Sequence, residues 1–250
     1  MGTRPVDVTS DVRPAVRFDE VSKRFGKVVA LDGFSLSIPD GGVFGLVGRN
    51  GAGKTTAMRM LLGLVAADSG SVELTHGLRI GYVPEAPTQY GWMTAREYLH
   101  LGARLASIPE PGRQERIAHL SQQVHLSDVD MRIREYGVGD RMKLAIAFAM
   151  IGQPDLLILD EPTSALDPSE EHDLLEIIAS FRYETTVLFV SHVLRDVERI
   201  ADSITIMDQG RMLAQGSMDE LRLQTNLQPE LRRIHPSLED VFATLTEGES

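Results

Sequence analysis

The chain has 250 residues, and its 36 acidic side chains outnumber its 25 basic ones, which gives a formal net charge of −11 at pH 7. With 42% hydrophobic residues, a chain of this length can bury a sizeable core in one large or two small domains, so a disordered or fibrous protein is excluded. The acidic balance argues against a general nucleic-acid coat, and the absence of cysteine excludes disulfides, thiolate metal sites and a cysteine nucleophile.

No apolar stretch of the sequence reaches the roughly 20 residues that a membrane-spanning helix needs. The longest such stretches are residues 61–67 and 144–151. Residues 1–14 lack the apolar segment of a secretory signal and are predicted to form a flexible tail. We therefore expect an intracellular protein whose association with a membrane comes through a partner.

The first ninety residues predict five short strands and one helix, with a turn at residues 39–42 where proline, aspartate and glycine cluster. The strands are expected at 16–21, 34–38, 43–47, 71–74 and 78–83, and the helix at about 54–64.

A helical pattern replaces the strand pattern between residues 93 and 134. Thr94 and Glu97 have the spacing of a capping box, and apolar residues follow at helical intervals. Two prolines between 108 and 112 end this helix, and a second one is expected at about 113–124. We interpret residues 91–135 as a helical subdomain inserted into an α/β body.

Strands and helices alternate along the rest of the chain, which favours a largely parallel sheet with helices packed on it. Helices are expected at 141–151, 169–181 and 193–200, strands at 156–160, 186–190 and 203–207, and at most two short amphipathic helices after residue 217.

The strongest motif is the run G-R-N-G-A-G-K-T at residues 48–55, a full match to G-x-x-x-x-G-K-[ST] between a predicted strand and a predicted helix. The glycines let the loop curl so that backbone N–H groups point at phosphate oxygens, and the helix N-terminus adds partial positive charge. Lys54 would reach the β- and γ-phosphates, and the Thr55 hydroxyl would ligate Mg²⁺. The expected nucleotide contacts come from Arg49, Asn50, Gly51, Ala52, Gly53, Lys54, Thr55 and Thr56.

A second motif is the run L-L-I-L-D-E at residues 156–161, which predicts a buried strand ending on two carboxylates. Adjacent residues of a strand point to opposite faces, so we expect Asp160 and Glu161 to have different roles. Asp160 would bind Mg²⁺ directly or through water, and Glu161 would polarise the water that attacks the γ-phosphate. The alternative interpretation is an acidic turn at a strand end.

Together with the P-loop, the run D-E-P-T-S-A-L-D-P at 160–168 resembles the ATP-binding subunit of ABC transporters, and the resemblance extends from about residue 16 to 216. It implies an α/β fold, the ABC ATPase fold, in which a P-loop NTPase core with a mostly parallel sheet carries an N-terminal antiparallel β part and a helical insert. We expect this domain over residues 15–216 and a short C-terminal helical extension over 217–250.

The resemblance also implies roles for residues outside the loop. Phe25 stands where the family stacks an aromatic ring on adenine, and His192 ends a predicted strand as the family's switch histidine does, where it would contact the γ-phosphate. Residues 164–167 resemble the D-loop, which crosses a dimer interface. Glu85 replaces the family's metal-sensing glutamine, and a carboxylate can ligate Mg²⁺ as an amide oxygen can.

The signature sequence LSGGQ of the family aligns with residues 136–140, Y-G-V-G-D, and only its second glycine, Gly139, is kept. In the family the signature of one copy meets the nucleotide bound by the other. Gly137 lacks the serine hydroxyl that would reach the γ-phosphate, and Asp140 adds negative charge near a polyanion. We therefore predict slow ATP hydrolysis by the isolated protein.

The resemblance implies an ATP-binding and hydrolysing subunit, cytoplasmic at the inner face of the cell membrane, that powers a separate permease. Residues 92–99 and 236–242 resemble the ABC-2, drug-export-like branch, although helices that merely pack on the body would account for both segments. The subunit would pair with itself or with another ABC ATPase, and no nucleic acid is expected. Two alternatives stay open: a non-catalytic nucleotide sensor, and a soluble ABC ATPase acting on nucleic acid or ribosomes.

Overall fold

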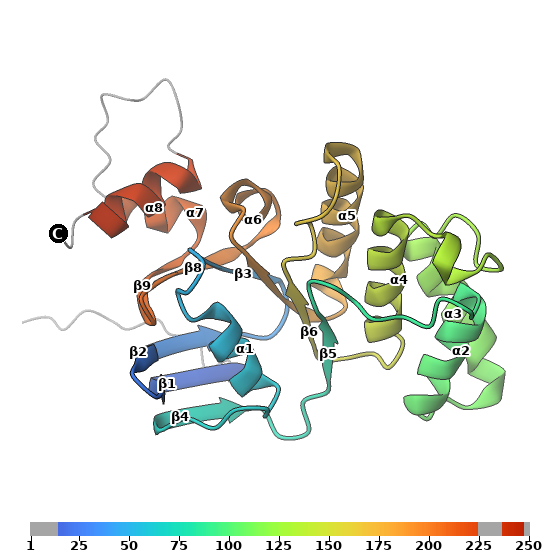
Figure 1. The fold of residues 1–250 in the computed structure, drawn as a ribbon, viewed down its shortest axis with the longest axis horizontal. Coiled ribbons are helices and arrows are strands. Elements are labelled where there is room, and N and C mark those ends of the chain that lie inside the picture. Colours follow the sequence, from blue (N-terminus) through green and yellow to red (C-terminus); the bar gives the residue numbers. More distant parts are fainter. Residues whose placement is uncertain (1–14, 225–236, 248–250) are drawn as a thin grey trace, which may run out of the picture.

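The structure, a computed structural model, describes residues 15–224 and 237–247. The tail predicted at 1–14 lies outside the described residues. The described residues form two sheets and eight α-helices, with α2 and α3 at one end of the molecule and α7 and α8 at the other (Figure 1).

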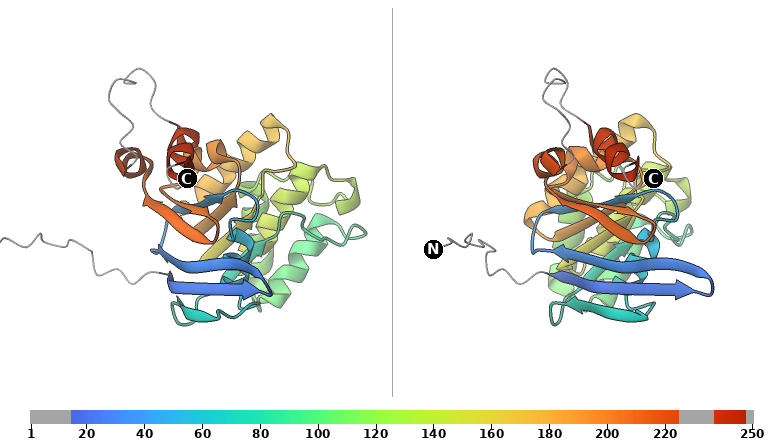
Figure 2. Two further views of the ribbon diagram at one scale, coloured as in Figure 1. Left: turned by 60° about the vertical axis from the view of Figure 1, so that its left-hand side comes forward. Right: turned by 90° about the vertical axis from the view of Figure 1, so that its left-hand side faces the viewer.

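A three-stranded antiparallel sheet contains the first two strands and the fourth, in the order β2-β1-β4. Its strands are β1 (Val16–Phe25), β2 (Val28–Ile38) and β4 (Ser69–Leu74). Figure 2 shows this sheet as a separate layer, on the side of the molecule away from α7 and α8. The antiparallel β part implied by the resemblance is therefore present.

The second sheet has six strands in the order β5-β6-β7-β3-β8-β9. The first five are parallel, and β9 pairs antiparallel with β8. The strands are β3 (Val43–Gly48), β5 (Ile80–Val83), β6 (Leu156–Asp160), β7 (Thr186–Ser191), β8 (Ser203–Asp208) and β9 (Arg211–Gly216).

The helices follow the predicted order. They are α1 (Lys54–Leu61), α2 (Ala95–Leu105), α3 (Glu110–Gln123), α4 (Val138–Met150), α5 (Pro168–Ser180), α6 (Leu194–Ile200), α7 (Met218–Gln224) and α8 (Leu238–Glu247), with short 3-10 turns at Ile133–Glu135 and Phe181–Tyr183.

Two hydrophobic cores lie on opposite faces of the six-stranded sheet, because successive strand residues alternate between the faces. In β6, Leu157 and Leu159 join the core shared with α2 to α6, whereas Leu156 and Ile158 join the core shared with α1 and the antiparallel sheet. All four side chains are fully buried. A strand buried on both faces reads as a continuous apolar run, which is why the sequence predicted this strand within its true limits.

Several boundaries differ from the sequence prediction. Helix α3 begins at residue 110 rather than 113, because Pro111 sits in the first helical turn, where a missing N–H costs nothing. Helix α4 begins at residue 138 rather than 141, with Gly137 as its N-cap. Strand β9 was not predicted, because it is an edge strand on which Ala214 alone is buried, so it shows no apolar alternation. The capping box of Thr94 and Glu97 is confirmed.

Candidate active site

The candidate site lies where four neighbouring parallel strands end together. Strands β5, β6, β7 and β3 are adjacent in the sheet, and their carboxyl ends deliver Glu85, the Asp160–Glu161 pair, His192 and the P-loop to one edge. A cavity of about 710 Å³ opens there. Its lining includes all the predicted nucleotide and metal residues except Gly139: Phe25, Arg49, Asn50, Gly51, Ala52, Gly53, Lys54, Thr55, Thr56, Glu85, Asp160, Glu161 and His192.

The P-loop takes a conformation that depends on glycine just before α1. Gly53, the N-cap of this helix, has φ 105°, and a Cβ atom at this residue would lie 2.5 Å from the carbonyl oxygen of Ala30. No side chain caps the helix, so its first backbone N–H groups are free of side-chain competition. The loop can therefore offer these N–H groups to phosphate oxygens.

Lys54 is buried at the base of the cavity. Its Nζ donates a hydrogen bond to the Gly48 carbonyl oxygen at 2.6 Å and lies 3.8 Å from Glu161 Oε1. Burial lowers the pKa of Lys54, whereas the negative charges of Glu161 and Asp160 act in the opposite direction. A polyanion bound in the cavity would add further stabilising charge to this ammonium group.

Glu161 leaves β6 in a strained conformation that turns its carboxylate toward the end of β7. Its φ is 48°, in the left-handed region that non-glycine residues rarely adopt. The carboxylate oxygen Oε2 accepts hydrogen bonds from the His192 backbone N–H at 3.1 Å and from the Ser191 hydroxyl at 3.3 Å, and His192 Nδ1 lies 2.8 Å away. These three contacts hold the carboxylate of Glu161 at the end of β7.

This turn changes one prediction. Strand alternation led us to expect Asp160 and Glu161 on opposite faces, but both line the same cavity. Asp160 is the last residue of β6, and the alternation stops where the backbone of Glu161 departs from strand geometry.

A concentration of negative charge surrounds Asp160. Burial raises the pKa of Asp160, and the charges of Glu161 and Glu85 raise it further. The Tyr82 hydroxyl donates a hydrogen bond to Asp160 Oδ2 at 3.4 Å, so one oxygen of this carboxylate already has a partner. A divalent cation would compensate this charge, and Thr55 supplies a hydroxyl oxygen in the same cavity.

Within the described ranges, no group of three His, Asp or Glu side chains could hold a metal ion by itself. The oxygen donors that line the cavity, from Thr55, Glu85 and Asp160, therefore fit Mg²⁺ better than a metal ion whose ligands all come from the protein. Mg²⁺ usually takes one or two protein carboxylates and completes its shell with substrate phosphates and water. The residues present therefore fit a magnesium ion that arrives with a phosphorylated ligand.

Phe25 ends β1 at the rim of the cavity. Its side chain is 48% exposed, and two valines of β2, Val28 and Val29, line the cavity beside it. These side chains give the polar cavity one apolar wall, against which a flat heterocyclic base can stack.

The signature segment lies away from this cavity. Gly139 is in the first turn of α4, and it is not among the described residues that line the cavity. The Asp140 carboxylate accepts a hydrogen bond from the Ser127 hydroxyl at 3.1 Å and lies 4.0 Å from Lys143 Nζ. The charge that sequence analysis placed toward a polyanion is therefore partly compensated within this chain.

Tyr82 and Ser191 were not predicted as site residues, although both contact the acidic residues of the site. Ser191 immediately precedes His192 and Tyr82 lies three residues before Glu85, so proximity to a motif residue was the available signal.

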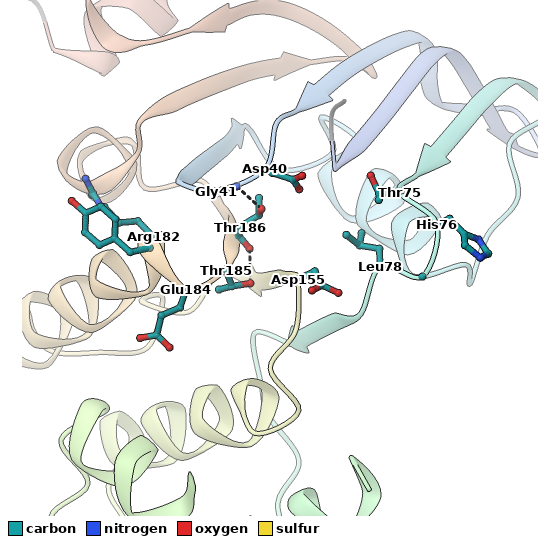
Figure 3. A pocket seen from close by; sticks show the side chains of 12 residues that line it. Asp40, Gly41, Thr75, His76, Leu78, Asp155, Arg182, Glu184, Thr185 and Thr186 are labelled. Atoms are coloured by element: carbon teal, nitrogen blue, oxygen red, sulfur yellow. Dashed lines mark hydrogen bonds between the residues drawn. The ribbon is translucent and has the colours of Figure 1, made fainter. Parts of the chain in front are cut away.

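A separate cavity of about 460 Å³ lies at the opposite edge of the sheet, where β6 and β7 begin (Figure 3). Two of its polar contacts join neighbouring protein groups: the Gly41 N–H donates to Thr186 Oγ1 at 2.9 Å, and the Thr185 hydroxyl donates to the Pro154 carbonyl oxygen at 2.8 Å. None of its lining residues belongs to the motifs described above.

Comparisons with known proteins place these motifs in context. A profile of the ABC transporter family matches residues 31–164. An uncharacterized ABC transporter ATP-binding protein of Nostoc sp. is 39% identical over 231 residues, which cover 88% of this chain and 68% of that protein. Nod factor export ATP-binding protein I of Ralstonia nicotianae is 34% identical over 83% of this chain and 68% of its own length. A solved ATP-binding subunit of an ABC transporter matches with a TM-score of 0.80 and 27% identity, over 93% of this chain and 99% of that one.

The described residues contain no helix that is both long and apolar enough to traverse a lipid bilayer.

Proposed function

This chain belongs to the ABC transporter family of ATP-binding proteins, and we propose that the cavity at its P-loop binds Mg–ATP and hydrolyses it to power an export permease. Family membership makes the chain an ATPase subunit of a transporter. The roles of individual residues and the direction of transport, export, are our proposal.

One observation carries the assignment of the reaction. The Glu161 carboxylate is fixed by His192 on one oxygen and lies beside Lys54 on the other, at the edge where the P-loop would hold the phosphates. A carboxylate held in this way can orient and polarise a water molecule for attack on the γ-phosphate. Lys54 and the loop N–H groups would stabilise charge on the phosphoryl oxygens as it develops, without a covalent intermediate.

Thr55, Asp160 and Glu85 are the residues that would hold Mg²⁺. When bound, the ion supplies positive charge that neutralises the phosphates. The protein's own contribution is to place Asp160 beside the cavity floor, with the Tyr82 hydroxyl on one of its oxygens. Phe25 would stack on the adenine at the rim.

We infer that the working unit is a pair of ATPase subunits. The signature segment does not line the cavity of its own chain, and its residues Gly137 and Val138 are exposed, so this surface is available to the nucleotide of a second copy or of a different ABC ATPase. The permease would dock beside Glu85 and the helical region, where Trp92 is 65% exposed and Tyr90 is 52% exposed. The chain would then lie at the cytoplasmic face of the membrane.

Export is supported by a relative, the Nod factor export protein, which is similar to this chain over most of its described length. The segments at 92–99 and 236–242 support the same branch. We do not assign the transported substrate, because the permease rather than the ATPase subunit selects it.

The decisive test is binding of Mg–ATP by the purified chain, measured by calorimetry, with Lys54→Ala as the test variant. Removing this ammonium group should weaken binding by about tenfold or more, since a hydrogen bond to a charged group contributes roughly 1.5–3 kcal/mol. Arg79→Ala is the matched control, because it removes a cation that pairs with Asp155 at the opposite edge of the sheet. Equal affinity in Lys54→Ala and the wild type would refute the proposed site.

A second candidate function is a nucleotide sensor that binds ATP without turnover, and the absence of a hydroxyl at Gly137 favours it. ATP turnover measured with the permease and partner subunit present separates the two functions, since a sensor would bind nucleotide and release no phosphate.

A further inference from the structure

The C-terminal helix α8 lies next to α6 and α7, the two helices closest to it (Figure 1). Its inner face is fully buried at Leu238 and Val241, and nearly so at Phe242. The Glu198 carboxylate of α6 accepts hydrogen bonds from the Leu238 N–H and from Arg222 of α7, both at 3.1 Å. Helix α8 is therefore held on α6, the helix that follows directly after His192.

This position brings α8 to the P-loop. The Arg49 guanidinium carbon lies 5.6 Å from the centroid of the Phe242 ring, within the range of a cation–π interaction. A cavity of about 430 Å³ lies between helix and loop, lined by Glu239 and Phe242 on one side and by the loop residues Arg49 and Asn50 on the other. Arg49, Asn50 and His192 line both this cavity and the nucleotide cavity, so the two spaces adjoin.

We propose that Phe242 is a positioning residue that holds the Arg49 side chain at the edge of the nucleotide cavity, so that α8 sets the affinity of the P-loop for ATP. The inference rests on the proposed function of the cavity. The P-loop is expected to bind phosphate through its backbone N–H groups and Lys54, and the Arg49 side chain would add a further contact.

The physical reason is the conformational freedom of arginine. Arg49 is an exposed residue on a loop, and an arginine side chain loses substantial rotamer entropy when it is ordered by a ligand. The face of the Phe242 ring attracts the guanidinium and restricts it before nucleotide arrives, while the N–H groups at the edge of the guanidinium remain able to donate to phosphate oxygens. Part of the ordering cost is thus met in the free protein.

The test is a double-mutant cycle on Mg–ATP affinity, measured by calorimetry on the full chain. Phe242→Leu keeps an apolar side chain but removes the ring face, and it should raise the ATP dissociation constant about two- to fivefold, the range that a cation–π contact to an exposed arginine supports. Arg49→Ala should have at least the same effect. The double variant should bind Mg–ATP no more weakly than Arg49→Ala alone. Phe242→Trp, which keeps an aromatic ring face, should retain wild-type affinity.

Leu245→Ala is the matched control. Leu245 is on the same helix and packs on the core, but it does not line the cavity, so its loss should leave ATP affinity unchanged. Additive effects of Phe242→Leu and Arg49→Ala would overturn the inference, as would an equal loss of affinity in Leu245→Ala, because α8 would then act only through packing. Lys54→Ala distinguishes a failure of this inference from a failure of the proposed function. If Lys54→Ala also binds ATP with wild-type affinity, the proposed nucleotide site itself is wrong.

Discussion

At the residue scale, the proposed hydrolytic chemistry depends on Glu161. Its left-handed backbone and its contacts with His192 and Ser191 fix the carboxylate beside Lys54. Glu161→Gln preserves the shape and removes the base, so ATP hydrolysis should fall by roughly 10²- to 10⁴-fold while ATP still binds. Phosphate release measured alongside calorimetric binding checks both halves of this prediction.

The control for this substitution is Glu176→Gln, which changes an exposed carboxylate on α5 that pairs with His172. Its turnover should equal that of the wild type. Wild-type turnover in Glu161→Gln would instead assign the base to another residue, with His192 as the first to test.

Asp160 gives a prediction about stability. Because its pKa is raised by burial and by Glu161 and Glu85, the folded protein keeps the proton at pH values where the unfolded chain has lost it. Stability is therefore lost as the pH rises from the usual Asp range through the folded pKa. Asp160→Asn should raise the Tm of the nucleotide-free protein at pH 7, by about 2–4 °C for each kcal/mol relieved, and the gain should shrink toward pH 4.

Asp155→Asn should behave in the opposite way, because hydrogen bonds from Arg79 lower the pKa of this carboxyl. The ion pair with Arg79 stabilises the fold at pH values above the usual pKa of aspartate, and this stabilisation is lost as the pH falls through the lowered pKa. Removing the charge should therefore lower the Tm at pH 7 and have a smaller effect at acidic pH. Thermal melts of both variants between pH 4 and 8 test the signs. A lower Tm for Asp160→Asn at pH 7 would contradict the account of its environment.

At the scale of elements, we expect the start of α4 to limit the ATPase rate of the isolated protein. A Cβ atom at Gly137 would meet nothing within 4 Å, so Gly137→Ser fits and adds a favoured N-cap residue. A missing donor at a phosphoryl-transfer site costs about 2.7–4 kcal/mol by analogy with an oxyanion donor. We expect low ATPase activity in the unmodified protein and at least a several-fold rise when Gly137→Ser is combined with Asp140→Gln.

Gly139→Ser provides the comparison, since it adds the same hydroxyl two residues later, where a Cβ atom would lie 2.7 Å from Glu170 Oε1. That variant should not gain activity. High turnover in the unmodified protein, or no response to the restored pair, would contradict the role assigned to the signature segment. Asp140→Gln also gives up the charge that lies near Lys143, so the melting temperature of each variant should be recorded with its rate.

At the scale of the whole molecule, the separation between the P-loop cavity and the signature segment predicts assembly. The Glu161→Gln variant should bind ATP without cleaving it, so two subunits that share the bound nucleotides should stay together. Mg–ATP should therefore convert this variant to a dimer of about twice the monomer mass in light scattering. Chelation of Mg²⁺ with EDTA should return it to the monomer, because the phosphate charges are then left uncompensated. A monomer under all conditions would point to a different ABC ATPase as the required partner.

Local chemistry and periodicity were sufficient for much of this protein. The P-loop spans consecutive residues, so the sequence alone could identify the motif at 48–55, and residues 49–55 line the cavity of about 710 Å³. Strand β6 was predicted within its true limits because burial on both faces produces an unbroken apolar run. The alternation of strands and helices after residue 140 predicted the parallel sheet, because a helix usually connects two parallel strands.

The tertiary structure decided the contacts that join distant segments. Glu161 meets His192 because β6 and β7 are neighbours in the sheet, and Arg49 meets Phe242 because α8 returns to the P-loop across nearly the whole length of the chain. The shared cavity of Asp160 and Glu161 depends on one left-handed residue, and the direction of Asp140 depends on Ser127. Periodicity indicates which face of an element is buried. Strand order, departures from regular backbone geometry and side-chain partners depend instead on which elements pack together, and a local sequence pattern does not specify that packing.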